Sequence, residues 1–570
     1  MLRANLTDLS KNRTNEDISS FIQRISYQHN LYFPSKFKQA PTTLNNVIKP
    51  NIRANHYRIV REITKKMQNL RKIANNVQNF QNIKYVELKN NLKEQKRAYK
   101  VMILKEKSKR VTNILKNSTN ISKTTWNIVN SSKGKVVIGV EQITEVLNDH
   151  FVAILNRNSN IKIDFNNFDY LKSYDNVLYI NPITVEEVEK SIDKLKNKKS
   201  ESHEGISNYF LKLIKYEISP LLTKYINHSI IECEFPDCLK EIKVIPLWKD
   251  SDPTNPGNYR PLSIVSPISK IYEMSVVQQI NKFLKINHIL CDNQYGFREK
   301  LSTEAAILRC YEAIISTKKK NPVVVVAIDI SKAFDSVNHD ILMFKLKKMG
   351  FGKEALKWIK SFMSQRKQYV HMRKGNKKYN SISRMIHGGI AQGSMIGPLL
   401  FILFINDLAI FLKVKVKSLL KSFFDLLFQW CKINLFNVNT IKSKFLLFNV
   451  NNELIKDFQV LLDDEQMERV AAAKYLGILL DDTLKFNDHV DIMCKKLHGA
   501  IFVLRVLSRF CDMNLLMVVY HSLFLSHILY CINACHVHKT TNKAIYYYYY
   551  LESRLLKTST RKSTLDSIRI

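Results

Sequence analysis

The chain has 570 residues, 45% of them hydrophobic and 24% charged, which allows several packed domains and argues against wholesale disorder. Its 88 lysines and arginines outnumber its 50 aspartates and glutamates, so the formal net charge is +38 and the pI is about 9.7. This excess points to a polyanionic partner, because cations that neutralise phosphates release condensed counterions. A basic protein without such a partner is the less favoured alternative.

Nine cysteines without a framework spacing are typical of a reducing compartment. The tightest cluster is Cys531, Cys535, His536 and His538, which lacks a second ligand pair at zinc-finger spacing, so we favour buried thiols over a zinc site. The first residues (MLRANLTDLSKNR) have no apolar core and predict no signal peptide. The apolar stretches 395–412 and 515–532 contain polar groups that would be costly in lipid, so we expect core helices and no membrane partner.

A very basic helical pattern covers residues 51–116, with 18 lysines and arginines against four glutamates. Apolar residues at three- and four-residue spacing, such as Ile59 and Ile63, predict one buried stripe. Two interpretations have equal weight: a solvated helical arm, or an arm that lies on RNA or DNA. In the second, the candidate nucleic-acid-binding residues are Lys65, Lys66, Arg71 and Lys72.

Residues 135–235 are again helical in pattern, with Thr184 and Glu187 as a capping box. The proline-rich segment between Lys243 and Tyr259 predicts a loop between a strand and a helix. The clearest strand is Pro322–Ile330, whose continuous β-branched run predicts burial on both faces.

Farther along, Asn338 predicts the start of a helix that ends near Gly350, and a second helix covers about 353–364. A hairpin is expected around Lys374-Gly375-Asn376, and another helix from about Ser394. The tyrosine run 546–550 has no functional interpretation.

Asp329 ends the apolar strand, where an unpaired carboxylate would be expensive unless a divalent cation relieved the cost. Asp335 follows at the strand-to-helix turn, in the string DISKAFD. An aspartate at a strand end is more often a cap or a turn residue, so this pair alone does not establish a metal site.

Its neighbours strengthen the case, because several short motifs follow one another in a specific order. They are Gly205–Lys212 (GISNYFLK), Asn258–Ser263 (NYRPLS), Gln294–Arg298 (QYGFR) with Leu301–Thr303 (LST), Asp329–Asp335 (DISKAFD), Gly389–Pro398 (GIAQGSMIGP), Phe404–Leu408 (FINDL), Trp430–Asn434 (WCKIN) and Lys474–Leu480 (KYLGILL). In this order, from about Leu195 to Phe510, the chain resembles the reverse transcriptases of non-LTR, jockey-like retrotransposons. The resemblance implies an RNA-directed DNA polymerase that takes an RNA template, a DNA primer and deoxynucleotides.

The resemblance also implies roles for single residues. Asp329 would be catalytic and would bind Mg²⁺ or Mn²⁺ together with the Ile330 carbonyl. The nucleotide-binding candidates are Arg260, Lys249, Phe334, Gln392 and Gly393, where Phe334 would crowd a ribose 2′-hydroxyl and Arg260 would clamp the triphosphate. Arg298 is a further nucleic-acid-binding candidate.

One part of the family pattern is missing. The family carries a second aspartate pair, in Y-A-D-D or F-A-D-D, on a hairpin between the INDL and W-x-x-x-N motifs. Here the interval is 409–429 (AIFLKVKVKSLLKSFFDLLFQ), too short for a hairpin of about 12 residues plus a helix. Its one acidic residue, Asp425, lies in a helical pattern, and the pairs Asp463-Asp464 and Asp481-Asp482 lie outside it. We therefore expect weakened metal binding and an impaired enzyme.

The resemblance implies an α+β, right-hand polymerase with a basic helical N-terminal extension. The expected regions are a basic arm (1–130), a helical region (131–235), fingers and palm (236–450), and a helical thumb or connector (451–570). No endonuclease region precedes residue 130, which together with the missing hairpin suggests a truncated, decaying or mis-spliced copy. The alternative to an enzyme is a catalytically silent nucleic-acid-binding remnant; an intron-type or telomerase-like enzyme and a helical scaffold fit less well. The sequence fixes neither oligomeric state nor a nuclear or cytoplasmic location, although it favours an intracellular one.

Overall fold

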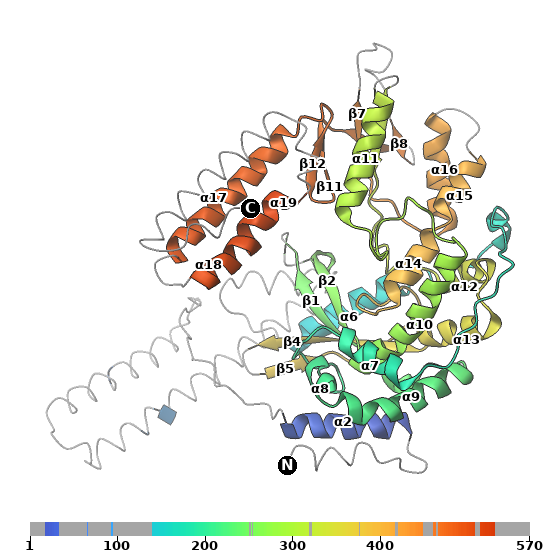
Figure 1. The fold of residues 1–570 in the computed structure, drawn as a ribbon, viewed down its shortest axis with the longest axis vertical. Coiled ribbons are helices and arrows are strands. Elements are labelled where there is room, and N and C mark those ends of the chain that lie inside the picture. The colour runs from blue at the N-terminus through green and yellow to red at the C-terminus, as the bar shows by residue number, and fades with distance from the viewer. Residues whose placement is uncertain are drawn as a thin grey trace. The chain divides into compact units, whose positions relative to one another are not determined.

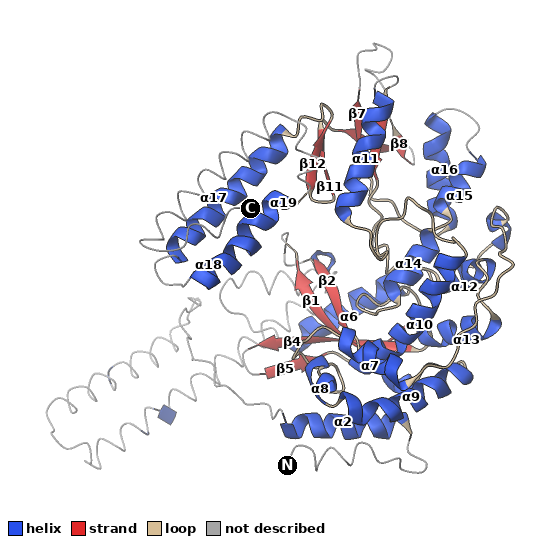
Figure 2. Cartoon of the chain, viewed as in Figure 1, coloured by secondary structure: helices blue, strands red, loops and turns tan. Residues whose placement is uncertain are grey.

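The computed structural model describes residues 17–32, 140–249, 252, 255–318, 322–374, 377–415, 420–448, 460–462, 465–507 and 513–530, together with the isolated residues 65, 90, 93 and 94. Helices and strands are mixed throughout (Figure 2), which confirms the α+β class. The chain divides into two compact units. Unit 1 comprises residues 1–159, 180–276 and 357–395, and unit 2 comprises residues 160–179, 277–356 and 396–570.

Unit 1 combines helices with a five-stranded sheet (Figure 1). Its helices are α2 (Ile18–Tyr32), α6 (Val140–Leu155), α7 (Val185–Lys194), α8 (Asn208–Leu213), α9 (Lys215–Ile231), η2 (Asp237–Leu239) and η3 (Pro256–Asn258). Its strands are β1 (Glu241–Trp248), β2 (Tyr259–Ile264), β4 (Arg366–Lys374), β5 (Lys377–Asn380) and β6 (Arg384–Ile386). Two of the boundaries between the units fall within α10 (Pro267–Ile286) and α13 (Lys353–Met363).

The sheet of unit 1 has the order β2-β1-β4-β5, and β6 also pairs with β4. Strands β1 and β2 are antiparallel, with Trp248 opposite Tyr259. The prediction of a loop between a strand and a helix is therefore wrong in one respect. The loop joins the two strands of a hairpin, and helix α10 follows the second strand. Helix α6 covers one face of the sheet, where Leu147 and Phe151 pack against Val244.

Two local predictions in unit 1 are confirmed. Thr184 and Glu187 form the capping box, each side chain bonded to the other's backbone N–H, at the start of α7. The hairpin forms where it was expected, because β4 and β5 are antiparallel with Lys374 opposite Lys377. The second hairpin run is divided between β5 and β6, since both strands pair with β4.

Unit 2 holds a smaller sheet and most of the remaining helices (Figure 1). Its helices are η1 (Phe165–Phe168), α11 (Thr303–Lys318), α12 (His339–Lys348), α14 (Gly397–Ile405), α15 (Leu408–Lys415), α16 (Leu420–Ile433), α17 (Asn487–Leu507), α18 (Met513–Tyr520), the π-helix η5 (His521–Leu525) and α19 (Ser526–Leu529). Its strands are β3 (Val323–Ala327), β7 (Lys444–Phe448), β8 (Leu461–Leu462), β9 (Glu465–Gln466), β10 (Glu468–Arg469), β11 (Ala472–Tyr475) and β12 (Ile478–Asp481).

The expected central strand is β3, which is shorter than predicted and pairs antiparallel with β7 in the order β10-β7-β3. Its alternate valines pack into two clusters, Val323 and Val325 into one and Val324 and Val326 into the other. All five residues of β3 nevertheless remain only half-buried, so the prediction of full burial is wrong. The buried strand is β7, because it has a neighbour on each side.

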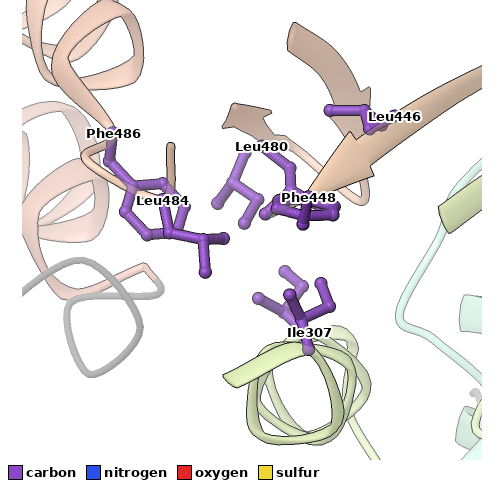
Figure 3. Close-up of a cluster of buried hydrophobic side chains, with 8 residues drawn as sticks. Ile307, Leu446, Phe448, Leu480, Leu484 and Phe486 are labelled. Atoms are coloured by element: carbon purple, nitrogen blue, oxygen red, sulfur yellow. The ribbon is translucent and has the colours of Figure 1, made fainter. Parts of the chain in front are cut away.

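One cluster of the unit 2 core joins α11, β7 and the β11–β12 hairpin (Figure 3). Ile307 and Ile314 of α11 pack with Leu446 and Phe448 of β7. The rest of the cluster comes from β12 and the turn after it: Ile478, Leu480, Leu484 and Phe486. Burial of these side chains fixes the KYLGILL hairpin against the sheet.

Two helix predictions for unit 2 are confirmed, after Asn338 and after Ser394. The core helix expected within 515–532 is wrong in its burial, because Val518 and Leu529 are 63% and 53% exposed. Asn338 caps α12 by accepting bonds from the N–H groups of Asp340 and Ile341, and Gly350 follows the helix with φ +88°. The helix expected from Ser394 begins later, at Gly397, and α14 is almost wholly buried. Among the described residues, no helix is long and apolar enough to cross a membrane.

Candidate functional site

Asp329 follows β3, and its backbone is held by the segment that leads into β7. Its N–H donates to Ser443 Oγ (3.2 Å), and its carbonyl accepts from the Asn439 N–H (2.8 Å). The carboxylate is half exposed, and Lys442 Nζ lies 3.9 Å from its Oδ2. The expectation of a buried, costly carboxylate is therefore wrong, because the strand ends before Asp329 and solvent reaches it.

The donor set around Asp329 does not fit a pair of divalent cations. A two-metal centre needs several anionic oxygens to hold two ions close together against their repulsion. Within the described ranges, no three residues of the types His, Cys, Asp and Glu come together as a metal site. In the same ranges an ammonium lies at ion-pair distance from the Asp329 carboxylate, which disfavours a metal cation there.

Phe334 lies in a short aromatic stack within unit 2. Its ring stacks on Phe401 of α14, with centroids 4.4 Å apart and an interplanar angle of 16°. The exposed ring of Phe297, from the QYGFR motif, meets Phe334 edge-on at 5.9 Å. These contacts hold Phe334 in one orientation, which a side chain that crowds a ligand requires.

Arg298 holds a loop together. Its Nη1 donates to the carbonyls of Cys291 (2.9 Å) and Gln294 (3.3 Å). Part of the guanidinium is thus already used within the QYGFR loop, which favours a structural role over a nucleic-acid contact.

Two candidate nucleotide-binding cations lie on the β1–β2 hairpin of unit 1. Lys249 follows β1 and is exposed, and its N–H donates to the Asn258 carbonyl (2.9 Å). Arg260 of β2 is exposed and lies opposite Leu247. The described ranges contain no ion-pair partner within 4 Å of either side chain.

Gly393 lies directly against β2 in the same unit. A Cβ at this position would be 2.5 Å from the Ser263 carbonyl oxygen, and φ is +132°. Both the close contact and the positive φ therefore require a glycine. Two residues on, the Met395 N–H donates to the buried carboxylate of Glu273. The structure therefore brings Gln392 and Gly393 into unit 1 together with Arg260 and Lys249.

The interval that should carry the second aspartate pair is helical where it is described. It contributes α15 and α16, and Asp425 is an exposed residue in the middle of α16. Directly after these helices, β7 pairs with β3. This agrees with the prediction that Asp425 lies in a helix and not in a turn.

Asp481 has a structural role in the turn after β12. Its carboxylate accepts bonds from the N–H groups of Thr483 (3.1 Å), Lys485 (3.1 Å) and Phe486. These bonds support the turn that leads into α17.

A buried polar network in unit 2 was missed by sequence reasoning. The ammonium of Lys345 contacts the Phe404 carbonyl (2.7 Å), Asp407 Oδ1 (2.8 Å) and Asn434 Oδ1 (2.6 Å). Burial lowers the pKa of Lys345 to about 8, an effect that the Asp407 charge opposes. The available signal was a lysine on the apolar stripe of α12, beside Ile341 and Leu342.

Several predicted residues lie outside the described part of the chain. They are Lys66, Arg71, Lys72, the cluster of Cys531, Cys535, His536 and His538, the pair Asp463-Asp464, and the tyrosine run 546–550. Lys65 is described only as an exposed helical residue.

Comparisons with known proteins bear on the whole motif series. Residues 248–425 match the family described as reverse transcriptase (RNA-dependent DNA polymerase). The chain is 30% identical to the probable RNA-directed DNA polymerase from transposon BS of Drosophila melanogaster, over 59% of this chain and 40% of that protein. It is 26% identical to the RNA-directed DNA polymerase from mobile element jockey of the same species, over 56% of this chain and 38% of that protein.

A similar match, also 26% identical, is to the probable RNA-directed DNA polymerase from transposon X-element of Drosophila melanogaster. The chain spans about two fifths of the length of these curated relatives. The predicted resemblance is thereby confirmed: residues 248–425 match the reverse transcriptase family, and the chain is similar to polymerases of non-LTR, jockey-like retrotransposons.

Proposed function

We propose that this chain is an RNA-directed DNA polymerase of a mobile element by descent, with impaired polymerisation and retained nucleic-acid binding. Two observations support the impairment: Asp329 meets the ammonium of Lys442, and the interval that should supply the second aspartate pair is helical where it is described. Polymerisation is an in-line attack of a primer 3′-hydroxyl on the α-phosphate of a nucleotide, with two Mg²⁺ ions at the attacking and leaving oxygens.

The proposed architecture is a right hand. The five-stranded sheet that contains the β1–β2 hairpin would belong to the fingers. Strands β3 and β7 would belong to the palm, and α17 to α19 would form a helical thumb or connector. The boundaries at 130, 235 and 450 remain predictions, as does the basic N-terminal arm.

For nucleotide binding, we propose that Arg260 clamps the triphosphate with its forked guanidinium and that Lys249 adds a point charge. Gln392 and Gly393 would contact the incoming nucleotide and the template, since the glycine permits close backbone approach. Phe334 would crowd a ribose 2′-hydroxyl. Two observations support these roles: the exposed cations without ion-pair partners in the described ranges, and the aromatic stack that orients Phe334.

Primer extension tests the impairment. The purified chain is given an RNA template, a DNA primer, deoxynucleotides and either Mg²⁺ or Mn²⁺, and the product is compared with that of Asp329→Ala. We expect the unaltered chain to extend the primer weakly at most, and Asp329→Ala not to extend it above background. Robust extension by the unaltered chain that Asp329→Ala abolishes would show that the remaining donors suffice.

A catalytically silent nucleic-acid-binding protein is the second candidate, favoured by the same Asp329–Lys442 contact. Salt-sensitive binding of a primer–template without incorporation supports it over the enzyme. Sequencing the transcript across codons 405–430 adds an independent check: an additional in-frame segment there would mean that the expressed protein does carry the second aspartate pair.

A further inference from the structure

The sheet of unit 1 has two chemically different faces. Helix α6 covers the face formed by Ile242, Val244 and Val370. Because successive residues of a strand point to opposite faces, their neighbours belong to the other face. We call that face the basic face and define it by Lys243 and Leu247 of β1, Arg260 and Leu262 of β2, His371 and Arg373 of β4, and Lys378 of β5.

Three cations of the basic face repel one another. Arg373 lies directly opposite Lys378 in the antiparallel β4–β5 pair, an arrangement that is destabilising for like charges. Burial lowers the pKa of Lys243, and the charges of Arg373 and Lys378 lower it further, while Glu201 opposes them. In the described part of the chain, none of the three has a carboxylate at ion-pair distance. A bound anion would relieve this repulsion.

His371 provides a second, independent observation. Its side chain is buried, and its Nδ1 lies 2.7 Å from Asn380 Oδ1. Its Nε2 is buried and has no hydrogen-bond partner among the described residues. Burying such an atom without a partner is unfavourable, and a ligand or water bonded to it would relieve that cost. Burial lowers the pKa of His371, and the same three cations lower it further, so the ring adds no positive charge of its own.

The shape and chemistry of the face favour an extended polyanion with apolar parts. Leu247 and Leu262 are 47% and 43% exposed. Leu247 lies opposite Arg260 in the β1–β2 pair, and Leu262 lies two residues after Arg260 on β2. Neighbouring strands are about 4.8 Å apart, so the cations from β2 to β5 spread over roughly 14 Å. Cations that track a phosphate backbone, interleaved with side chains that contact bases, are typical of single-strand binding.

We propose that Lys243, Arg373 and Lys378 form a phosphate-binding subsite for the backbone of a single-stranded nucleic acid that continues across the sheet from Arg260. This inference deepens the proposed function and rests on its nucleic-acid-binding part. It does not depend on residual polymerisation, because Asp329 and the nucleotide take no part in it.

The test measures binding of fluorescent single-stranded RNA and of DNA of the same sequence by anisotropy, with EDTA and without deoxynucleotides, over a range of salt concentrations. The test variant is Lys243→Gln/Arg373→Gln/Lys378→Gln. The matched control, Lys190→Gln/Lys194→Gln/Lys224→Gln, removes the same charge from exposed positions on α7 and α9 of the same unit. Circular dichroism and thermal melting verify that both variants are folded.

We expect the test variant to bind on the order of 10- to 100-fold more weakly at 0.1 M salt. The slope of the logarithm of the binding constant against the logarithm of the salt concentration should fall in magnitude by about 2, because three single-strand phosphate contacts are lost. The control should stay within about threefold of the unaltered protein. A charge-preserving variant, Lys243→Arg/Arg373→Lys/Lys378→Arg, should restore the slope. Equal losses of affinity in the test and control variants would overturn the subsite, because they would show that only the total charge of the protein matters. An unchanged salt dependence of binding in the test variant would overturn it as well. Neither result bears on primer extension, so a failure of the subsite is distinguishable from a failure of the proposed enzyme descent.

Discussion

The ammonium of Lys345 lies 2.8 Å from Oδ1 of Asp407, and both side chains are completely shielded from solvent. Asp407 belongs to the FINDL motif, and Asn434, the last residue of WCKIN, accepts a further bond from the same ammonium. Asp407 also accepts from the Tyr170 hydroxyl. The FINDL and WCKIN motifs therefore contribute to the packing of unit 2, because the Lys345 ammonium connects α12 with the ends of α14 and α16.

Removing one member of this pair should be costly. Lys345→Met leaves a buried carboxylate without its cation, and we expect it to lower the free energy of unfolding by about 3–5 kcal/mol, whereas Lys345→Met/Asp407→Leu should recover most of that loss. Urea denaturation measures both. The control Arg309→Gln breaks an exposed ion pair in the same unit and should cost less than about 1 kcal/mol. A double variant as unstable as the single one would contradict this account.

Gly393 should tolerate no side chain. Gly393→Ala would bring a Cβ to 2.5 Å from the Ser263 carbonyl at φ +132°, so we expect a loss of roughly 1–3 kcal/mol in thermal or urea unfolding. Gly499→Ala in α17 is the matched change, because nothing lies within 4 Å of its Cβ, and it should stabilise the protein by about 0.5–1 kcal/mol. Equal effects at the two positions would show that the close approach to β2 does not constrain the loop.

His203 should make stability depend on pH. Its Nδ1 lies 3.3 Å from Glu204 and its Nε2 3.6 Å from Glu241. Burial alone would lower the pKa of His203, but the hydrogen bond and charge of Glu204 and the charge of Glu241 outweigh burial and raise it, while Lys243 opposes them. A raised pKa in the folded state means that the stabilisation is complete below about 6.5 and is lost as pH rises through the folded value.

The measurement for His203 is the difference in unfolding free energy between the unaltered protein and His203→Gln from pH 5 to pH 9. This difference should shrink as pH rises. The control His228→Gln, at an exposed position of the same unit, should show no such trend. A difference that grows with pH would mean that burial, not the two carboxylates, dominates at His203.

Asp481 and Asp482 offer a matched pair of neighbours. Asp481→Ala removes the acceptor of three backbone N–H groups in the turn before α17, and we expect a loss of about 1–2 kcal/mol. Asp482→Ala should change stability by less than about 0.5 kcal/mol. Urea unfolding measures both, and equal losses would refute the turn-supporting role of Asp481.

Local signals in the sequence predicted local structure well. The capping box at Thr184, the N-cap at Asn338 and the hairpin at Lys374 each depend on a few adjacent residues, and all three are confirmed. The motif order identified the reverse transcriptase region for a different reason, since many short matches in one sequence order are improbable by chance.

Long-range features could not be predicted in this way. The partial exposure of β3 depends on its position at the end of the order β10-β7-β3, which periodicity does not encode. The Lys345–Asp407 pair joins residues 62 positions apart, and the basic face joins four strands whose register is set only by folding. For Asp329, the sequence predicted its place at the strand end but not the ammonium of Lys442 beside it.

The turn formed by Asp481 has a practical consequence for interpreting paired aspartates in a sequence. Its carboxylate already accepts three backbone N–H groups of the chain that follows β12, so recruiting it for an ion would weaken the turn that leads into α17. An aspartate doublet in a retroelement reading frame is therefore a poor diagnostic of competence.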